Sequence, residues 1–208
     1  MIAINTYYQS WRKRVFDLCF SICLLVLLSP LFILVGLTIY VTSGFPIIFK
    51  QKRSGLNGKE FVIYKFRTME KNASITKHKY LKFNEAPLPM FKIHNDPRFV
   101  GFGRFFSRSG IDELPQLLNI LKNEMSFVGP RPLPVKEANL LPKTWKKFRE
   151  KVKPGIFSDW SLAEKRHSDI KQWEKLEKAT ILKNEKEQYK LIVKMVIYLL
   201  RKALKIFI

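Results

Sequence analysis

Acidic residues are scarce in this 208-residue chain, where 17 Asp and Glu stand against 38 Lys and Arg and give a formal net charge of +21. An excess of this size indicates an anionic partner, such as nucleic acid, anionic lipid or a phosphorylated substrate. A hydrophobic content of 47% excludes a disordered basic tail. The length predicts one domain with appendages and a core of modest size.

Cysteine and histidine are also rare. Cys19 and Cys23 stand one helical turn apart in an apolar run, where they point outward together and are poorly placed for a disulfide. We interpret them as apolar packing residues. The three histidines, His78, His94 and His167, have no carboxylates near them at metal-ligand spacing, so we place them on the surface or in loops.

The signatures of nucleic-acid-binding proteins are missing as well. The sequence contains no helix-turn-helix, zinc-ligand or RNA-binding motif, although its charge would allow such a function. It also contains no internal repeat and no low-complexity segment. We therefore expect no nucleic-acid partner.

Charged side chains are absent from residues 18–41, a run long enough to span a bilayer. A cleaved signal peptide fits poorly, because the run is too long and no small-x-small cleavage site follows it. Ser29-Pro30 interrupts the run, and proline kinks a helix. Basic residues flank both ends, namely Arg12, Lys13 and Arg14 before it and Lys50, Lys52 and Arg53 after it. The positive-inside rule favours a re-entrant hairpin, which satisfies both flanks; the alternative is a single crossing with an incidental kink.

Two local contacts are expected in this segment. The carbonyl near Val26, which the proline leaves without a donor, needs a partner in lipid, and the Ser29 hydroxyl is close enough to supply one. Asp17 lies just inside the apolar boundary, where a charge must be paired. Arg14 and Lys13, three and four residues earlier on the helix, are its expected partners.

The remainder predicts a mainly helical α+β domain with a short β-hairpin. Residues 47–49 and 61–64 are strand candidates on either side of a turn at residues 55–58. Residues 70–91 predict a loop with one short helix. Because proline is tolerated only in a first turn, Pro115 makes the helix over residues 112–122 begin near residues 110–112. Further helices are predicted over residues 103–107, 143–151, 169–189 and 191–208.

The last predicted helix carries Lys194, Arg201, Lys202 and Lys205 between aliphatic clusters. A basic amphipathic helix of this kind suits the surface of an anionic leaflet. A C-terminal helix docked on the domain is an equal alternative.

Asp112 and Glu113 form an acidic pair at a predicted helix start. The helix N-terminus stabilises negative charge and is expected to keep Asp112 ionised. An ionised Asp can attack phosphorus, and a neighbouring Glu can hold Mg²⁺ together with substrate phosphates. Lys65 and Arg131 would neutralise phosphate oxygens. The alternative is an acidic pair that only caps the helix.

Several long motifs around this pair resemble one family. Residues 109–117 (SGIDELPQL), Asn119 and residues 125–132 (MSFVGPRP) are similar to the signature of the bacterial sugar transferases, the monotopic phosphoglycosyl transferases. Further matches occur in the same order: KRVFD at residues 13–17, Ser29-Pro30, FKQKRSG at residues 49–55, Gly58, KFRTM at residues 65–69, and DPR at residues 96–98. The resemblance covers residues 12–156.

The resemblance implies a re-entrant membrane helix over residues 1–44 and a cytoplasmic catalytic domain over residues 45–208, at the bacterial inner membrane. It implies that Asp112 attacks the β-phosphate of a UDP-sugar and releases UMP. A polyprenol phosphate such as undecaprenyl phosphate then accepts the phosphosugar, as the first membrane step of glycoconjugate synthesis. Glu113 would bind Mg²⁺. The expected phosphate contacts are Lys65, Arg67, Arg108 and Arg131.

The chain departs from the family pattern in two places. Ser107 stands where family members usually carry an Arg, and Arg108 follows it. After Gly155 the chain has an altered segment, FSDWS at residues 157–161, in which Trp160, with Arg166 further on, would replace the usual residues. A catalytically inactive membrane scaffold of the same fold is therefore the alternative function. Anionic inner-membrane lipids and a second copy in a homodimer are further expected partners.

Overall fold

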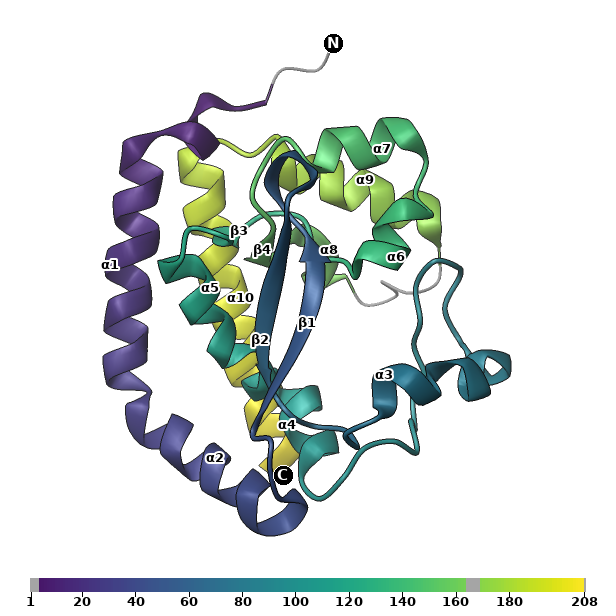
Figure 1. Cartoon of the computed structure of the whole chain (residues 1–208). Coiled ribbons are helices and arrows are strands. Elements are labelled where there is room, and N and C mark those ends of the chain that lie inside the picture. The colour runs from purple at the N-terminus through teal and green to yellow at the C-terminus, as the bar shows by residue number, and fades with distance from the viewer. Residues whose placement is uncertain (1–3, 164–168, 208) are drawn as a thin grey trace.

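The computed structural model describes residues 4–163 and 169–207, with side chains up to residue 202. Helices predominate, and the strands form two small two-stranded sheets (Figure 1). In chain order the elements are η1 Thr6–Gln9, α1 Trp11–Leu27, α2 Ser29–Ser43, β1 Ile48–Ser54, η2 Leu56–Gly58, β2 Glu60–Phe66, α3 Ala73–Thr76, η3 Lys77–Phe83, α4 Gly103–Ser109, η4 Ile111–Gln116, α5 Leu117–Leu121, β3 Ser126–Val128, α6 Val135–Asn139, α7 Lys143–Arg149, β4 Gly155–Phe157, α8 Asp159–Leu162, α9 Ile170–Ile181 and α10 Glu185–Phe207.

The apolar segment is a bent pair of helices, and α2 turns away from α1 by 62° (Figure 1). Pro30 lies in the first turn of α2, where its missing N–H costs no helical hydrogen bond. The Ser29 hydroxyl donates to the Val26 carbonyl at 2.9 Å, so both the predicted kink and the predicted partner are confirmed. Over residues 4–163 and 169–207, no single helix is long and apolar enough to cross a bilayer, whereas the bent pair together meets the requirement in length and composition alone.

The two sides of this helix pair differ sharply. Toward the domain, Lys13 Nζ donates to Asp17 Oδ1 at 2.6 Å and both side chains are buried, which confirms the predicted ion pair. Arg14 instead donates to the carbonyls of α5 at Ile120 and Leu121. The outward side carries exposed apolar side chains: Ile22, Val26, Leu27, Ile33, Leu34, Leu37 and Val41. Such a continuous apolar surface is typical of contact with lipid.

The cysteines correct one interpretation. Cys19 and Cys23 have free thiols, as predicted, but both are exposed on the outward side of α1 and pack in no protein core. They belong to the same outward apolar surface, because the helical period keeps residues 19, 22, 23 and 26 on one side.

The predicted β-hairpin is confirmed. Strands β1 and β2 pair antiparallel from Ile48 opposite Phe66 to Ser54 opposite Glu60, around the turn that ends at Gly58. The short parallel pair β3–β4 is not predicted by the sequence. It depends on Gly129 and Gly155, because a Cβ at Gly155 would lie 2.1 Å from the Gly129 nitrogen.

The predicted helix over residues 112–122 has a different form. Gly110 adopts a left-handed conformation with φ of 83° and ends α4. A 3₁₀ helix, η4, follows, and regular α-helix begins only at Leu117 in α5. Pro115 supplies no amide proton and would clash with the carbonyl of Ile111 in an α-helical turn. Asp112 and Glu113 therefore lie in a tight 3₁₀ turn and not at an α-helix N-terminus.

The C-terminal helix is docked, at least in its first half. Leu191, Ile192 and Met195 of α10 are buried in the central core with β2, α5 and β3. Figure 1 shows α10 running behind α5 and the hairpin. The opposite side of α10 exposes Val193, Val196, Ile197 and Leu200. The docked alternative is thus confirmed for residues 191–195, while an apolar strip on the other side stays open.

Candidate active site

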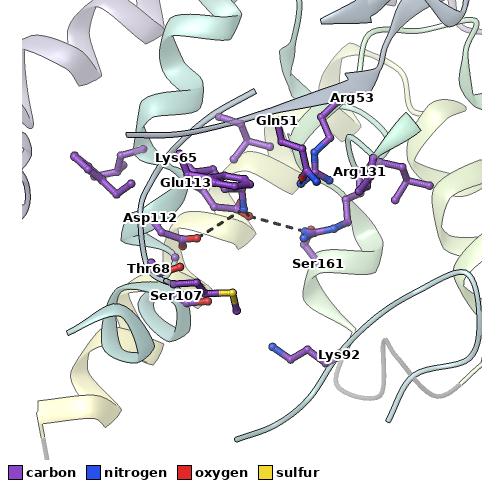
Figure 2. A pocket seen from close by; sticks show the side chains of 18 of the residues that line it. Gln51, Arg53, Lys65, Thr68, Lys92, Ser107, Asp112, Glu113, Arg131 and Ser161 are labelled. Carbon is purple, nitrogen blue, oxygen red and sulfur yellow. Dashed lines mark hydrogen bonds and ion pairs between the residues drawn. The ribbon is translucent and has the colours of Figure 1, made fainter. Parts of the chain in front are cut away.

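Asp112 and Glu113 lie at a cavity of about 500 Å³ in which β1, β2, η4 and the loop after β3 meet. Figure 2 shows Lys65 from β2 beside Asp112 and Glu113, with Arg131 approaching from the other side. All four residues line this cavity. Leu24 of the bent helix pair and Met195 and Tyr198 of α10 also line the cavity.

Lys65 connects the two carboxylates. Its ammonium lies 2.6 Å from Glu113 Oε1 and 3.7 Å from Asp112 Oδ2. Arg131 lies 3.9 Å from the same Glu113 oxygen. Both ion pairs of Glu113 thus use one oxygen, and Asp112 has only the more distant contact with Lys65. The geometry gives Glu113 most of the neutralising charge.

The electrostatics separate the two acids. Burial raises the pKa of Asp112 to about 6, and Glu113 adds to the rise, while Lys65 opposes it. Burial would also raise the pKa of Glu113, but Lys65 and Arg131 outweigh it and hold that pKa at about 2. The α-helix N-terminus expected to stabilise the charge of Asp112 is absent, because the turn is 3₁₀, and burial raises the pKa; at about 6 the carboxyl is nevertheless mostly ionised at neutral pH, as expected. Paired carboxyls with separated pKa values are typical of catalytic sites.

Two predicted phosphate contacts are placed differently: Arg67 lines the cavity but its guanidinium is bound to backbone carbonyls, and Arg108 does not line the cavity. Arg67 is buried, and its guanidinium donates to the carbonyls of Ser43, Gly44 and Phe45 at the end of α2. It fixes the exit of the helix pair onto the hairpin, so it is a structural residue in this conformation. Arg108 is exposed and is not among the cavity-lining residues, whereas Ser107 is. The residue that replaces the usual Arg therefore faces the cavity, and its charged neighbour does not.

Arg131 is held by a buried network that the sequence did not predict. Glu177 of α9 is fully buried and accepts from the Arg131 amide at 3.2 Å and from Arg149 at 3.0 Å. Its other oxygen accepts from Trp145 at 3.0 Å. The Arg131 guanidinium lies 5.3 Å above the ring of Trp160. Glu177 had no sequence signal, because it stands in a highly charged helix where every acid appears solvated.

Further cavity residues come from β1 and from the altered segment after Gly155. Phe49, Gln51 and Arg53 alternate along β1, and all three line the cavity. A period of two could have identified this face from the sequence. Trp160 and Ser161 also line the cavity, so the altered segment is part of the site. Arg166 and His167 lie outside the described residues.

Comparison with known proteins identifies the family of the chain. The profile of the family described as "Bacterial sugar transferase" matches residues 8–201. The chain belongs to the bacterial sugar transferases.

Relatives from several organisms support this membership. The exopolysaccharide production protein ExoY of Sinorhizobium fredii is 37% identical over 155 residues, which are 73% of this chain and 68% of that protein. The uncharacterized sugar transferase EpsL of Bacillus subtilis is 39% identical over 78% of this chain and 72% of its own length. An undecaprenyl-phosphate glucose phosphotransferase of Komagataeibacter xylinus is 40% identical over 70% of this chain, but the match spans only 26% of that longer protein.

In this sugar transferase, the acids fit a magnesium site in which the protein supplies only one or two ligands. Among the described residues, no group of three His, Cys, Asp or Glu could hold a metal ion by itself. Mg²⁺ typically takes one or two carboxylates and completes its shell with water and substrate phosphates. Asp112 and Glu113 both line the cavity and supply such carboxylates. Glu113 is better suited, because its low pKa keeps it ionised.

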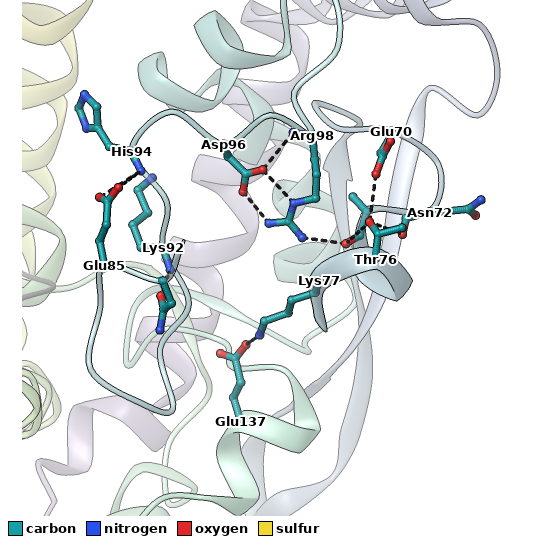
Figure 3. A network of polar contacts seen from close by, with 12 residues as sticks. Glu70, Asn72, Thr76, Lys77, Glu85, Lys92, His94, Asp96, Arg98 and Glu137 are labelled. Carbon is teal, nitrogen blue, oxygen red and sulfur yellow. Dashed lines mark hydrogen bonds and ion pairs between the residues drawn. The ribbon is translucent and has the colours of Figure 1, made fainter. Parts of the chain in front are cut away.

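The family motif at Asp96-Pro97-Arg98 has a structural place. Arg98 forms a bidentate pair with Asp96, with Nε to Oδ1 at 2.8 Å and Nη2 to Oδ2 at 2.5 Å (Figure 3). Its third nitrogen donates to the Ala73 carbonyl at 2.8 Å. Lys77 reaches Glu137 of α6 at 2.8 Å and ties the same loop to the domain. The motif therefore shapes the wall of the cavity formed by residues 70–98.

Proposed function

We propose that this sugar transferase moves a sugar 1-phosphate from a UDP-sugar to a polyprenol phosphate such as undecaprenyl phosphate. The observation that carries the proposal is a buried aspartate beside a glutamate, a lysine and an arginine in one cavity. Relatives named as undecaprenyl-phosphate glucose and galactose phosphotransferases support the reaction class.

In the first step, an Asp112 oxygen attacks the β-phosphorus of the donor. A bond forms between this oxygen and phosphorus, and the bond from phosphorus to the bridging oxygen breaks. UMP leaves with the bridging oxygen and both bonding electrons, and the sugar phosphate stays on Asp112. Lys65, 3.7 Å from Asp112, is placed to offset the charge of the phosphate oxygens as they approach the carboxylate.

In the second step, an oxygen of the polyprenol phosphate attacks the same phosphorus. The bond from phosphorus to Asp112 breaks, which regenerates the carboxylate and yields a polyprenyl diphosphate sugar. Leu24 of the bent helix pair lines the same cavity as Asp112, together with Met195 and Tyr198. This shared lining supports entry of the polyprenol from the side of the helix pair.

Magnesium is part of the proposal. When bound, Mg²⁺ would polarise the donor phosphates and neutralise charge on the departing group. Glu113 is the residue that would hold it, with Asp112 nearby. Lys65 and Arg131 form ion pairs with Glu113, and both are placed to neutralise the donor phosphates as well.

The location at the cytoplasmic face of the inner membrane follows the same reasoning. The exposed apolar side of the α1–α2 pair and the basic flanks support a re-entrant hairpin among anionic lipids. Single cysteines placed at residues 5 and 57 of a Cys19→Ser, Cys23→Ser chain test it. A membrane-impermeant thiol reagent should label both from the cytoplasmic side only, and labelling of residue 5 from the periplasm would exclude the hairpin.

The activity is tested with purified protein, a panel of UDP-sugars, undecaprenyl phosphate and Mg²⁺. We expect UMP release with at least one donor. Without the lipid, intact-protein mass spectrometry should detect a mass increase equal to one sugar phosphate. Absence of UMP with every donor would favour the inactive scaffold instead.

A further inference from the structure

Arg53 lies in β1 and faces the cavity, although it belongs to no predicted site. Its guanidinium donates to the Pro132 carbonyl at 2.9 Å and to Gln51 Oε1 at 2.6 Å. The bridge between Arg53 and Pro134 fixes the backbone of β1 against the loop that carries Arg131. The side chain is therefore held in one orientation, beside the same loop as Arg131.

The charge of Arg53 is offset only in part by protein acids, the more distant carboxylates of Glu137 and Glu113. Within the described part of the chain, Arg53 forms no ion pair, and its buried Nε has no hydrogen-bond partner. Burial and the nearby charge of Arg131 lower its pKa to about 10. Burial removes water from Arg53, and the like charges of the two arginines repel each other. An anion bound between them would offset both the desolvation and the repulsion.

The position of this pair indicates which anion. Figure 2 shows Gln51 and Arg53 reaching toward Arg131 from above, with Asp112 on the far side of Glu113. Lys65 and Glu113 lie between Asp112 and Arg131. Arg131 is linked to Asp112 only through Glu113 and Lys65, so an anion bound by Arg53 and Arg131 lies farther from the nucleophile than one bound by Lys65, in the order expected for the second phosphate of a diphosphate.

We propose that Arg53 and Arg131 form a phosphate subsite for the nucleoside monophosphate part of the donor, the part that leaves. This inference rests on the proposed function. The bridging oxygen takes up negative charge as its bond to the β-phosphorus breaks, and the two guanidiniums stabilise that charge. Lys65 serves the transferred phosphate, and Arg53 serves the departing one. Arginine suits this role, because its planar donors match phosphate oxygens in pairs.

The test measures binding of UMP and of uridine, which lacks the phosphate, to the full chain by calorimetry. Arg53→Gln should weaken UMP binding at least tenfold and leave uridine binding unchanged. Arg53→Lys should restore part of the loss, because it returns the charge but not the paired donors. Lys52→Gln is the matched control: this neighbouring side chain is 75% exposed and pairs with Glu60 on the outer side of the hairpin. It should bind UMP like the wild type.

A second measurement needs no variant. In the wild-type protein, UMP should protect Arg53 from the arginine reagent phenylglyoxal, as followed by peptide mass spectrometry, and uridine should not. Equal modification with both ligands, or an Arg53→Gln protein that binds UMP normally, would overturn the subsite. Equal losses of UMP and uridine binding in Arg53→Gln would overturn it too, because they would indicate a general structural effect.

The subsite and the transferase activity can fail separately. A protein that binds UMP through Arg53 but releases no UMP from any donor would keep the subsite and lose the proposed reaction. A protein that transfers phosphosugar but whose affinity for UMP is the same with and without the Arg53 side chain would support the reaction and exclude the subsite.

Discussion

Two acid–base clusters face the same cavity, and they are built in opposite ways. Around Asp96 and Arg98, every guanidinium nitrogen has a partner, and both side chains are buried (Figure 3). Burial would raise the pKa of Asp96, but its hydrogen bonds and ion pair with Arg98 lower it overall. Around Asp112, the nearest cation is 3.7 Å away, and burial raises the pKa of the acid to about 6 (Figure 2).

The difference separates residues that hold the structure from residues available for chemistry. A carboxylate with all its lone pairs occupied stabilises the fold but has no capacity for a substrate. A buried carboxylate with incomplete pairing lowers the stability of the fold, but it stays available to react. Such destabilising groups are characteristic of active sites. Both pairs belong to family motifs, so motif membership alone does not distinguish them.

The largest expected effect comes from Asp112→Asn. The amide cannot form the acyl phosphate, so transfer should fall by at least about 10³-fold, the scale seen when a nucleophile is removed. Thermal stability should be unchanged or slightly higher, because the variant removes a poorly paired buried charge. UMP release and the melting temperature check both points. Turnover of the variant near the wild-type rate would contradict the nucleophile assignment.

The reverse pattern is expected for Arg98→Met. Removing the partner leaves the Asp96 carboxylate buried and unpaired, a change that typically costs about 3–5 kcal/mol. The melting temperature should fall by several degrees, while protein that remains folded below the transition should still form the phosphosugar adduct. Arg104→Met, an exposed arginine nearby, is the control. An Arg98→Met protein with unchanged melting temperature would show that the comparison of the two clusters is wrong.

Much of this organisation could be predicted from local signals. Ser29-Pro30 predicted the bend, because proline acts on the helix that contains it. Short apolar runs at residues 47–49 and 61–64, on either side of the turn at residues 55–58, predicted the hairpin. The acidic pair with Lys65 and Arg131 was found through motifs, and the structure brings these residues to one cavity.

What could not be predicted depends on long-range contacts. The roles of Arg67 and Glu177 are decided by elements more than 20 residues away in sequence. The pKa of Asp112 depends on burial, which no local pattern gives. The 3₁₀ form of η4 was within reach, since Pro115 and Gly110 both stand in the sequence, but their joint effect requires the backbone path.

A pH profile sharpens the comparison through a change of charge alone. The rate of adduct formation should be steady above about pH 6 and should fall about tenfold per unit below it, because the protonated Asp112 is not a nucleophile. Stability should respond in the other direction: a raised pKa favours the protonated folded state, so the contribution of Asp112 is lost as pH rises through about 6. This loss of stability near pH 6 should be absent in Asp112→Asn. Identical stability profiles for both proteins would contradict the raised pKa.

The smallest effect on activity is expected for Glu177→Gln, which alters the support of Arg131 without touching the cavity charges, although loss of the buried ion pair with Arg149 should lower stability as in Arg98→Met. The carboxylate accepts from the Arg131 amide, Arg149 and Trp145 through two oxygens, and glutamine offers only one acceptor oxygen. Loss of one such bond, about 1 kcal/mol, corresponds to about fivefold in kcat/KM if it loosens Arg131. UMP affinity should fall with kcat/KM, and uridine affinity should not. A lower melting temperature with unchanged kcat/KM would instead mean that Glu177 stabilises only the fold, like Asp96. Its hydrogen bond to the Arg131 amide would then have no role in activity.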